Sequence, residues 1–380
     1  MYFRLLPEVY LVVGKNKSLL QNILSKKSLW IDNNLAYLLK ECEKNKTVPL
    51  EQKEIFESLS DNNWGIISNN PIFIDKYRLT NIFNNKRFFK DVPYISSAIL
   101  KLTNDCNLSC YNCGKVFCPT CFKSENTDRC MSLKKWKEVV RNLKKFGCKH
   151  IILTGGECVL YPDLMVLCDF ISYLNMTFTV STNGMKRVEG YNKKLSILIS
   201  LFDADNISKI VENYKEYKNV TLVVYCSLEN KKNIAIPSEW TVLISSTRAP
   251  KINKNNMPNM DIFNFFLRKE HNKCLNGKIA IMENGDVYPC LGACISDTKF
   301  SNYCVNNDFD YDIIKNKKVG NVIFDKWSTV IKSIMENYWN NKIDDDMVCA
   351  LCEFRYACDR CIFNDPRQNC NYILEESLWK

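Results

Sequence analysis

The chain has 380 residues, 46% of them hydrophobic and 12% aromatic, which is enough apolar material for two or three domains with sizeable cores. Lys and Arg exceed Asp and Glu by 52 to 42, for a formal net charge of +10, but the basic residues are scattered in pairs, which argues against a nucleic-acid partner. No stretch approaches the ~18 apolar residues of a membrane span, and the N-terminus lacks the layout of a signal peptide. We therefore expect a cytoplasmic protein with no membrane partner.

The chain has 20 cysteines but only two histidines, His150 and His271. In a reducing compartment thiols stay reduced, so clustered cysteines at short spacing are more often metal ligands than disulfides. With so few histidines, a metal site would consist almost entirely of thiolates, which favours iron–sulfur clusters or zinc.

A small winged-helix-like unit is predicted for residues 1–92. Short strands, two helices and a hairpin follow one another within fewer than a hundred residues. Cys42 is the only cysteine before residue 95, so the composition changes near Pro93. The patterns are β-type runs at residues 10–13 and 28–32, helical runs at residues 34–42 and 52–59, and hairpin runs WGIIS and PIFID around Asn69, Asn70 and Pro71.

Residues 93–255 alternate between runs typical of strands and runs typical of helices. The first four are YISSAILKLT, SLKKWKEVVRNLKKFG, HIILTGG and DLMVLCDFISYL, with Ser132 as a helix N-cap and Gly147 as a helix C-cap. Repeated βα units with short connections predict an α/β fold, in which a parallel sheet wrapped by helices forms a partial or full barrel. Ligands of such sheets bind at the carboxyl ends of the strands.

Residues 256–380 form a cysteine-rich region. An Asn- and Lys-rich stretch around residues 253–276 ends the barrel pattern, and few long periodic segments follow it. A region that cannot assemble a large core from regular elements often depends on metal ligation for its fold.

Three cysteines at C-x3-C-x2-C spacing, Cys106, Cys110 and Cys113, come directly after the strand AILKLT. Three thiolates on one short loop can bind three irons of a [4Fe-4S] cluster and leave the fourth iron without a protein ligand. The alternative is half of a zinc site, although zinc loops favour C-x2-C pairs repeated twice.

A second motif, Thr154-Gly155-Gly156-Glu157, ends the next strand. Two glycines there expose backbone to a closely approaching ligand, and Glu157 offers an acceptor for an ammonium group, although GGE alone is also a common turn. Small polar residues end two later strands and can hydrogen-bond a ribose or a carboxylate, or else simply form turns. These residues are Ser181, Asn183 and Ser200.

The cysteine loop and the GGE motif together resemble the radical SAM superfamily. The resemblance implies a partial (β/α)6 TIM-like barrel whose cluster chelates S-adenosylmethionine (SAM) through its fourth iron and cleaves it to methionine and a 5′-deoxyadenosyl radical. Cys158 stands where the family usually has proline. The implied SAM contacts are Gly155, Gly156, Glu157, Ser181, Asn183 and Ser200.

The C-terminal cysteines, with flanking sequences such as CLNGKIAIMENGDVYPC and CEFRYAC, resemble the SPASM domain, a module that carries auxiliary iron–sulfur clusters. Cys358 and Cys361 are separated by two residues where three are common. Zinc ribbons are the alternative. By the family pattern, one auxiliary cluster is held by Cys349, Cys352, Cys358 and Cys370, and the other by Cys274, Cys290 and Cys361, with Cys294 favoured over Cys304 or an open iron as the fourth ligand.

Family members with a SPASM domain act on ribosomal peptides or protein side chains, and residues 1–92 resemble a leader-binding element. The resemblance therefore implies a peptide maturase that installs a crosslink, thioether or epimerised centre in a precursor peptide, with a ferredoxin or flavodoxin as electron donor. The alternatives are a non-catalytic cluster-containing peptide-binding partner, an enzyme that modifies a folded protein such as a sulfatase, and a zinc-rich nucleic-acid binder.

The remaining cysteines divide into two groups. Three follow the first cysteine loop and are an extra metal site, substrate-facing thiols or incidental; spacing does not decide. These are Cys118, Cys121 and Cys130. The others lie on apolar faces and are expected in cores. They are Cys42, Cys148, Cys168 and Cys226.

Overall fold

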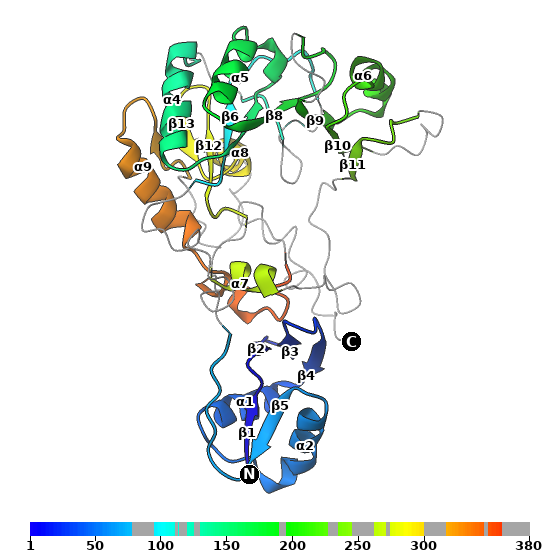
Figure 1. Cartoon of the computed structure of the whole chain (residues 1–380), viewed down its shortest axis with the longest axis vertical. Helices are drawn as coiled ribbons and strands as arrows, with labels where there is room; N and C mark the ends of the chain where they lie inside the picture. The colour runs from blue at the N-terminus through cyan, green and yellow to red at the C-terminus, as the bar shows by residue number, and fades with distance from the viewer. Residues whose placement is uncertain are drawn as a thin grey trace.

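In the computed structural model the strands of the described residues form three sheets. Figure 1 shows a blue N-terminal unit at one end and a larger parallel sheet at the other. Within the described part of the chain, no helix is long and apolar enough to cross a lipid bilayer. The described residues are 1–77, 95–110, 113, 120–124, 130–189, 195–226, 235–244, 262–270, 274–299, 317–345 and 349–358.

The N-terminal unit consists of two antiparallel sheets and two helices, and its predicted helices and β-type runs are confirmed to within two residues at each end. Asp32 caps the first helix by accepting a hydrogen bond from Leu35 N at 2.8 Å. The winged-helix-like class of the unit stays a prediction. The elements are β1 (Tyr2–Leu5), β2 (Val9–Val13), β3 (Ser18–Asn22), β4 (Ser28–Ile31), α1 (Asn33–Glu43), α2 (Lys53–Asp61) and β5 (Gly65–Ser68).

The predicted hairpin at the end of this unit is wrong. The run WGIIS does form β5, but β5 pairs antiparallel with β1, with Leu5 opposite Gly65, and residues 71–77 form no strand. The apolar strand β1 supplies a partner sixty residues away, and a local pattern cannot reveal such a pairing. Phe3 of β1 packs edge-on against Phe56 at 4.9 Å and anchors the pair in the core.

Six parallel strands in chain order form the main part of the large sheet, which confirms the predicted parallel sheet. The predicted caps are also confirmed: Ser132 accepts from Lys135 N at 3.4 Å, and Gly147 has a φ of 87°, which favours glycine. The strands are β6 (Ser97–Lys101), β7 (His150–Thr154), β8 (Thr177–Thr182), β9 (Ser196–Leu201), β10 (Val220–Val224) and β11 (Thr241–Ile244). The helices among them are α4 (Leu133–Lys145), α5 (Leu164–Tyr173) and α6 (Ile207–Tyr214).

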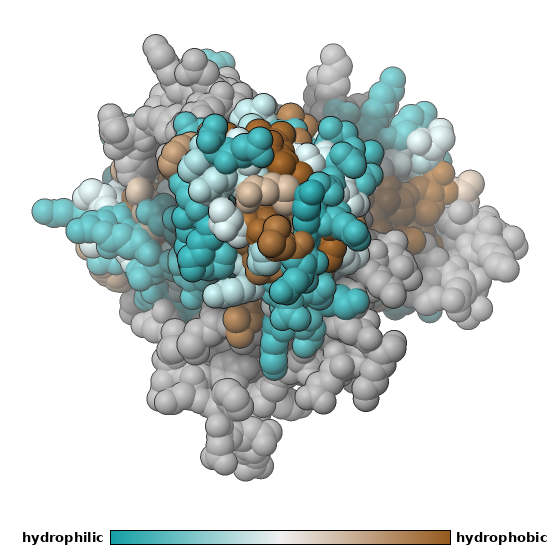
Figure 2. All heavy atoms as spheres, turned by 90° about the horizontal axis from the view of Figure 1, so that it is seen from below, coloured by the Kyte–Doolittle hydropathy of each residue, from teal (hydrophilic) through white to brown (hydrophobic). Residues whose placement is uncertain are grey.

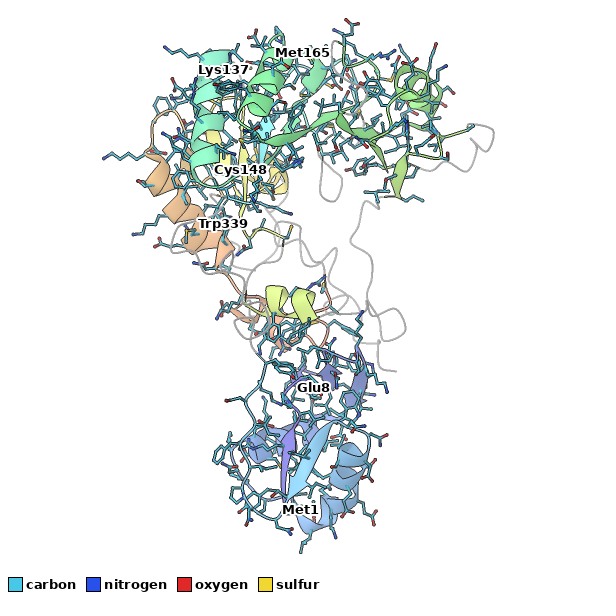
Figure 3. All side chains as sticks on the ribbon, in the orientation of Figure 1. Met1, Glu8, Lys137, Cys148, Met165 and Trp339 are labelled. Atoms are coloured by element: carbon cyan, nitrogen blue, oxygen red, sulfur yellow. The ribbon has the colours of Figure 1, made fainter. Side chains whose placement is uncertain are left out.

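Strands from the cysteine-rich region extend this same sheet. β12 (Lys278–Ile281) pairs parallel with β6, and β13 (Asp286–Tyr288) and β14 (Gly320–Asn321) continue antiparallel from it. Trp339, labelled in Figure 3, donates from its indole Nε1 to Lys278 O at 2.9 Å. The helices of this region are α7 (Ile262–Glu270), α8 (Leu291–Lys299) and α9 (Trp327–Ile334), the last followed by a π-helical turn at Met335–Trp339.

The N-terminal unit packs against the cysteine-rich region. Tyr10 of β2 lies against Phe265 of α7 with ring centroids 4.7 Å apart, and both rings belong to one buried apolar cluster. Arg355 donates from Nη1 to Val13 O at 2.9 Å, and Lys15 N donates to Leu351 O at 2.8 Å. Residues near the two ends of the chain therefore form one packed interface, below the parallel sheet in Figure 1.

Candidate active site

The loop that carries the C-x3-C-x2-C cysteines leaves the carboxyl end of β6. Leu102 N donates to Thr154 O at 2.7 Å, which holds the start of the loop against the end of β7. Burial raises the pKa of Cys110 to about 11, and the neighbouring thiols of Cys113 and Cys106 add to the shift. Burial also raises the pKa of Cys106. The three thiols interact electrostatically, but among the described residues they are not arranged as a metal-binding group. A metal that binds them must displace their protons.

Gly155 and Gly156 allow this loop to approach β7 closely. Gly156 N donates to Thr103 O at 2.9 Å. A Cβ on Gly155 would lie 2.8 Å from Thr103 O, and a Cβ on Gly156 would lie 2.6 Å from Asn104 O. Side chains do not fit at these distances, so both positions require glycine. The sequence predicted glycines that admit a ligand, and in the structure they admit the cysteine loop itself.

Glu157 is 1% exposed and binds backbone amides. Its Oε1 accepts from Val159 N at 3.0 Å, and its Oε2 accepts from Asn183 N at 2.7 Å. Burial raises the pKa of its carboxyl group. An ionised carboxylate accepts about four hydrogen bonds, so these two amides leave capacity for an ammonium group.

Asn183 joins the end of β8 to the cysteine loop. Its side-chain Nδ2 donates to Asn107 Oδ1 at 2.7 Å, beside Cys106 in sequence. Its Oδ1 accepts from Met185 N at 3.0 Å, which orients the amide. The structure therefore brings Asn183 and Glu157 together with the cysteine loop, as the motifs predicted.

Ser181 and Ser200 meet a residue that the motifs did not single out, Thr120. Thr120 O accepts from Thr154 Oγ1 at 2.7 Å and from Ser181 Oγ at 3.2 Å, and the hydroxyls of Thr120 and Ser200 contact each other. Side chains of three adjacent strands thus face one point at the carboxyl end of the sheet. Thr154 was detectable in sequence as another strand-end hydroxyl, whereas Thr120 lies in an irregular segment with no local signal.

A buried ion pair lies beside the loop. Lys101 Nζ is 2.6 Å from Glu283 Oε1, and the side chains are 0% and 1% exposed. Lys101 also donates to Asn104 Oδ1 at 3.0 Å and to Ser124 Oγ at 3.2 Å. Sequence reasoning missed the pair, and its signal was a lysine within the apolar strand AILKLT.

The C-terminal cysteines are described only in part. Cys352 N donates to Cys349 O at 3.0 Å, and Arg268 Nη1 donates to Cys358 O at 2.7 Å. Among the described residues, no group of three or more His, Cys, Asp or Glu side chains is arranged to hold a metal ion. The predicted partition into two clusters stays a prediction. Cys274 is exposed, Cys290, Cys349, Cys352 and Cys358 are half-buried, Cys294 is buried, and Cys304, Cys361 and Cys370 lie outside the described residues.

The other cysteines follow the predicted division. Three of the four expected core residues are buried, and Cys226 is half-buried against the core. Figure 3 labels Cys148, which is fully buried. Of the undecided three, Cys118 lies outside the described residues and Cys130 is exposed. Burial, with the nearby charges of Glu157 and Cys113, raises the pKa of Cys121, which places this thiol near the cysteine loop.

No family model matches the chain. It is 30% identical over 129 residues to a probable GTP 3′,8-cyclase from Methanococcus maripaludis, which covers 34% of this chain and 41% of the relative. It is 29% identical over 109 residues to an S-adenosylmethionine-dependent nucleotide dehydratase from a Thermoplasmatales archaeon, with 27% and 40% covered. The chain thus spans less than half the length of these curated relatives.

Among solved structures, SuiB of Streptococcus suis bound to S-adenosylmethionine matches with a TM-score of 0.42 and 13% identity, over 95% of this chain and 96% of that one. The two sequence relatives are radical SAM enzymes, so the resemblance that the cysteine loop and the GGE motif indicated is confirmed at the level of the superfamily. The chain is related to radical SAM enzymes.

Proposed function

We propose that the chain is a radical SAM enzyme that modifies a ribosomally made precursor peptide, with a SAM-binding [4Fe-4S] cluster on Cys106, Cys110 and Cys113. One observation carries the proposal: motifs from three strands form a single site. Asn183 of the β8 end donates to Asn107 of the cysteine loop at 2.7 Å, and Gly156 of the β7 end donates to that loop at 2.9 Å.

The donor set fits such a cluster. Three neighbouring soft thiolates suit an iron–sulfur cluster, which when bound supplies the electron that cleaves SAM. The protein's own part is to bind and orient SAM. Glu157 would accept hydrogen bonds from the SAM amino group, and the hydroxyls of Ser181 and Ser200 would bind its ribose or carboxylate. The buried position of Glu157, 1% exposed, would shield that contact from water.

The N-terminal unit would bind the leader of the precursor peptide. Among the described strands β5 pairs only with β1, so its outer edge can accept an added strand. Figure 2 looks at this end of the molecule and shows apolar side chains gathered among hydrophilic ones. Ile66 on β5 is 39% exposed and Ile55 on α2 is 44% exposed. An amphipathic leader would cover such a surface.

The cysteine-rich region would hold two auxiliary clusters, with the ligands that the SPASM resemblance implies. β12 pairs parallel with β6 and β13 runs antiparallel to β12, so Cys290, which follows β13, lies at the edge of the sheet opposite the cysteine loop. Three clusters correspond to about twelve irons per chain. Cys349→Ala should lower the iron content of reconstituted protein by about four, and unchanged iron content would argue against a cluster there. The proposal also includes a ferredoxin or a flavodoxin as the electron donor and a cytoplasmic location for the enzyme.

Substitution of one cluster ligand tests the proposal. Anaerobically reconstituted protein should convert SAM to 5′-deoxyadenosine, and Cys110→Ala should abolish this while it keeps the iron of the auxiliary clusters. Cys130→Ala is the matched control, since Cys130 is exposed. Co-expression with a candidate precursor peptide should then change the mass of the peptide only when the loop cysteines are intact. Normal SAM cleavage by Cys110→Ala would overturn the assignment.

A nucleotide substrate is the second candidate, because the names of both sequence relatives refer to nucleotides. Those alignments leave about two thirds or more of this chain unmatched. Incubation with GTP and other nucleoside triphosphates separates the two candidates. A nucleotide product formed without any peptide would favour the second.

A further inference from the structure

The segment Thr120–Ser124, which we call the strap, crosses the carboxyl ends of the parallel strands. At its first residue, Thr120 O accepts from the side chains of Thr154 on β7 and Ser181 on β8, at 2.7 and 3.2 Å. The Thr120 hydroxyl contacts that of Ser200 on β9. Two residues later, Phe122 N donates to Gly155 O at 3.2 Å. The strap thus binds three neighbouring strands where the sheet presents its ligand-binding edge.

The other end of the strap is fixed by the buried ion pair. Ser124 Oγ lies 3.2 Å from Lys101 Nζ and 3.2 Å from Glu283 Oε1, and Ser124 N donates to Asn104 Oδ1 at 2.7 Å. Charge-assisted hydrogen bonds in a buried network are stronger than those between neutral hydroxyls. The end at Thr120 is therefore the weaker of the two attachments.

The strap makes its contacts with groups that the proposed function assigns to SAM. Ser181, Ser200 and the Gly155 backbone each have a strap atom as a hydrogen-bond partner. A small ligand that bound the same groups would have to replace these contacts. Each hydrogen bond that the ligand forms with these groups would replace one that the strap already makes. The net gain on binding would therefore be smaller, and the affinity for the ligand lower, than in a site without the strap.

We propose that the strap is an internal occupant of the SAM site, and that SAM displaces the strap at Thr120–Phe122 while Ser124 stays attached to Lys101 and Glu283. This inference rests on the proposed function of the site. Cys121 lies in the displaced part, half-buried and next to Thr120. Displacement would expose this half-buried thiol, which makes it a reporter of the movement.

Thr120→Val tests the inference, because it keeps the shape of the side chain and removes the hydroxyl that contacts Ser200 and accepts a long hydrogen bond from Tyr225 OH at 3.5 Å. Binding of SAM to cluster-loaded protein, measured by equilibrium dialysis, should tighten about 3- to 10-fold, the range expected when one hydrogen bond that competes with the ligand is lost. Thr179→Val is the matched control, since the Thr179 hydroxyl of β8 contacts Ser196 of β9 at 3.1 Å and His150 of β7 at 3.2 Å, away from the strap. It should leave the dissociation constant unchanged.

Alkylation of Cys121 by iodoacetamide gives a readout that needs no variant and no turnover. Peptide mass spectrometry should show faster labelling of Cys121 in the unmodified holoprotein when SAM is added, and unchanged labelling of exposed Cys130. Unchanged or weaker SAM binding by Thr120→Val, or SAM-dependent protection of Cys121, would overturn the inference. Absence of SAM binding by the unmodified holoprotein would instead refute the proposed function, and the strap inference with it.

Discussion

Removal of the Lys101 ammonium should cost more stability than any exposed charge in the described structure. Lys101→Met would leave Glu283, which is 1% exposed, without its partner at 2.6 Å. Breaking a buried pair on one side costs about 3 to 5 kcal/mol, because the remaining charge stays desolvated. The substitution also removes hydrogen bonds to Asn104 and Ser124, at 3.0 and 3.2 Å. We therefore expect the free energy of unfolding to fall by about 4 kcal/mol.

Urea unfolding followed by far-UV circular dichroism, under anaerobic conditions, measures this loss. Lys53→Met is the control, because the pair of Lys53 with Glu57 is 55% and 46% exposed and should contribute at most about 0.5 kcal/mol. The double variant Lys101→Met, Glu283→Leu should be more stable than the single variant, since no buried charge is left unpaired. A loss below about 1 kcal/mol for Lys101→Met would refute the reasoning, because it would mean that the pair is solvated in the folded protein.

Three further predictions follow from the described contacts. Gly156→Ala should prevent assembly of the SAM cluster in a folded protein, measured as a loss of about four irons, because the added Cβ would lie 2.6 Å from Asn104 O. Burial lowers the pKa of Lys76 from 10.5 to about 8. The unfolded chain therefore binds more protons between these values, so stability should rise with pH across that window, and Lys76→Met should remove the rise in urea titrations. Ile66→Lys should weaken binding of the precursor peptide and leave peptide-independent SAM cleavage unchanged; equal peptide affinity, by fluorescence anisotropy, would contradict the leader-binding proposal.

The parts of the site that the sequence revealed are local in the chain. Cys106, Cys110 and Cys113 occupy one loop, and Gly155 and Glu157 occupy one turn, so the sequence indicates each group as a local motif. Alternation of strand and helix patterns then predicts a parallel sheet, whose carboxyl ends meet along one edge. These two arguments predict that the loop and the turn lie at one edge of the sheet, and Gly156 N does donate to Thr103 O at 2.9 Å.

The parts that the sequence concealed depend on contacts between distant residues. Lys101 and Glu283 are 182 positions apart, so the lysine within the strand AILKLT does not indicate its partner. The pairing of β1 with β5 was missed for the same reason, and a false hairpin was predicted in its place. Thr120 contacts Ser200, 80 positions away, through a segment with no periodic pattern. Burial and pairing at such distances are decided by tertiary packing, which local propensity does not encode.

The cysteine loop is held by contacts with β7, with the end of β8 and with the cysteine-rich region. Glu283 follows β12, and it holds the loop through Lys101 and Asn104. A protein truncated after residue 255 would lack both Glu283 and the strand beside β6. Loss of SAM cleavage on truncation would therefore not show that auxiliary clusters take part in the chemistry, because the truncation also unpairs a buried lysine at the first cluster. Single cysteine substitutions, which leave Glu283 and β12 in place, separate the two explanations.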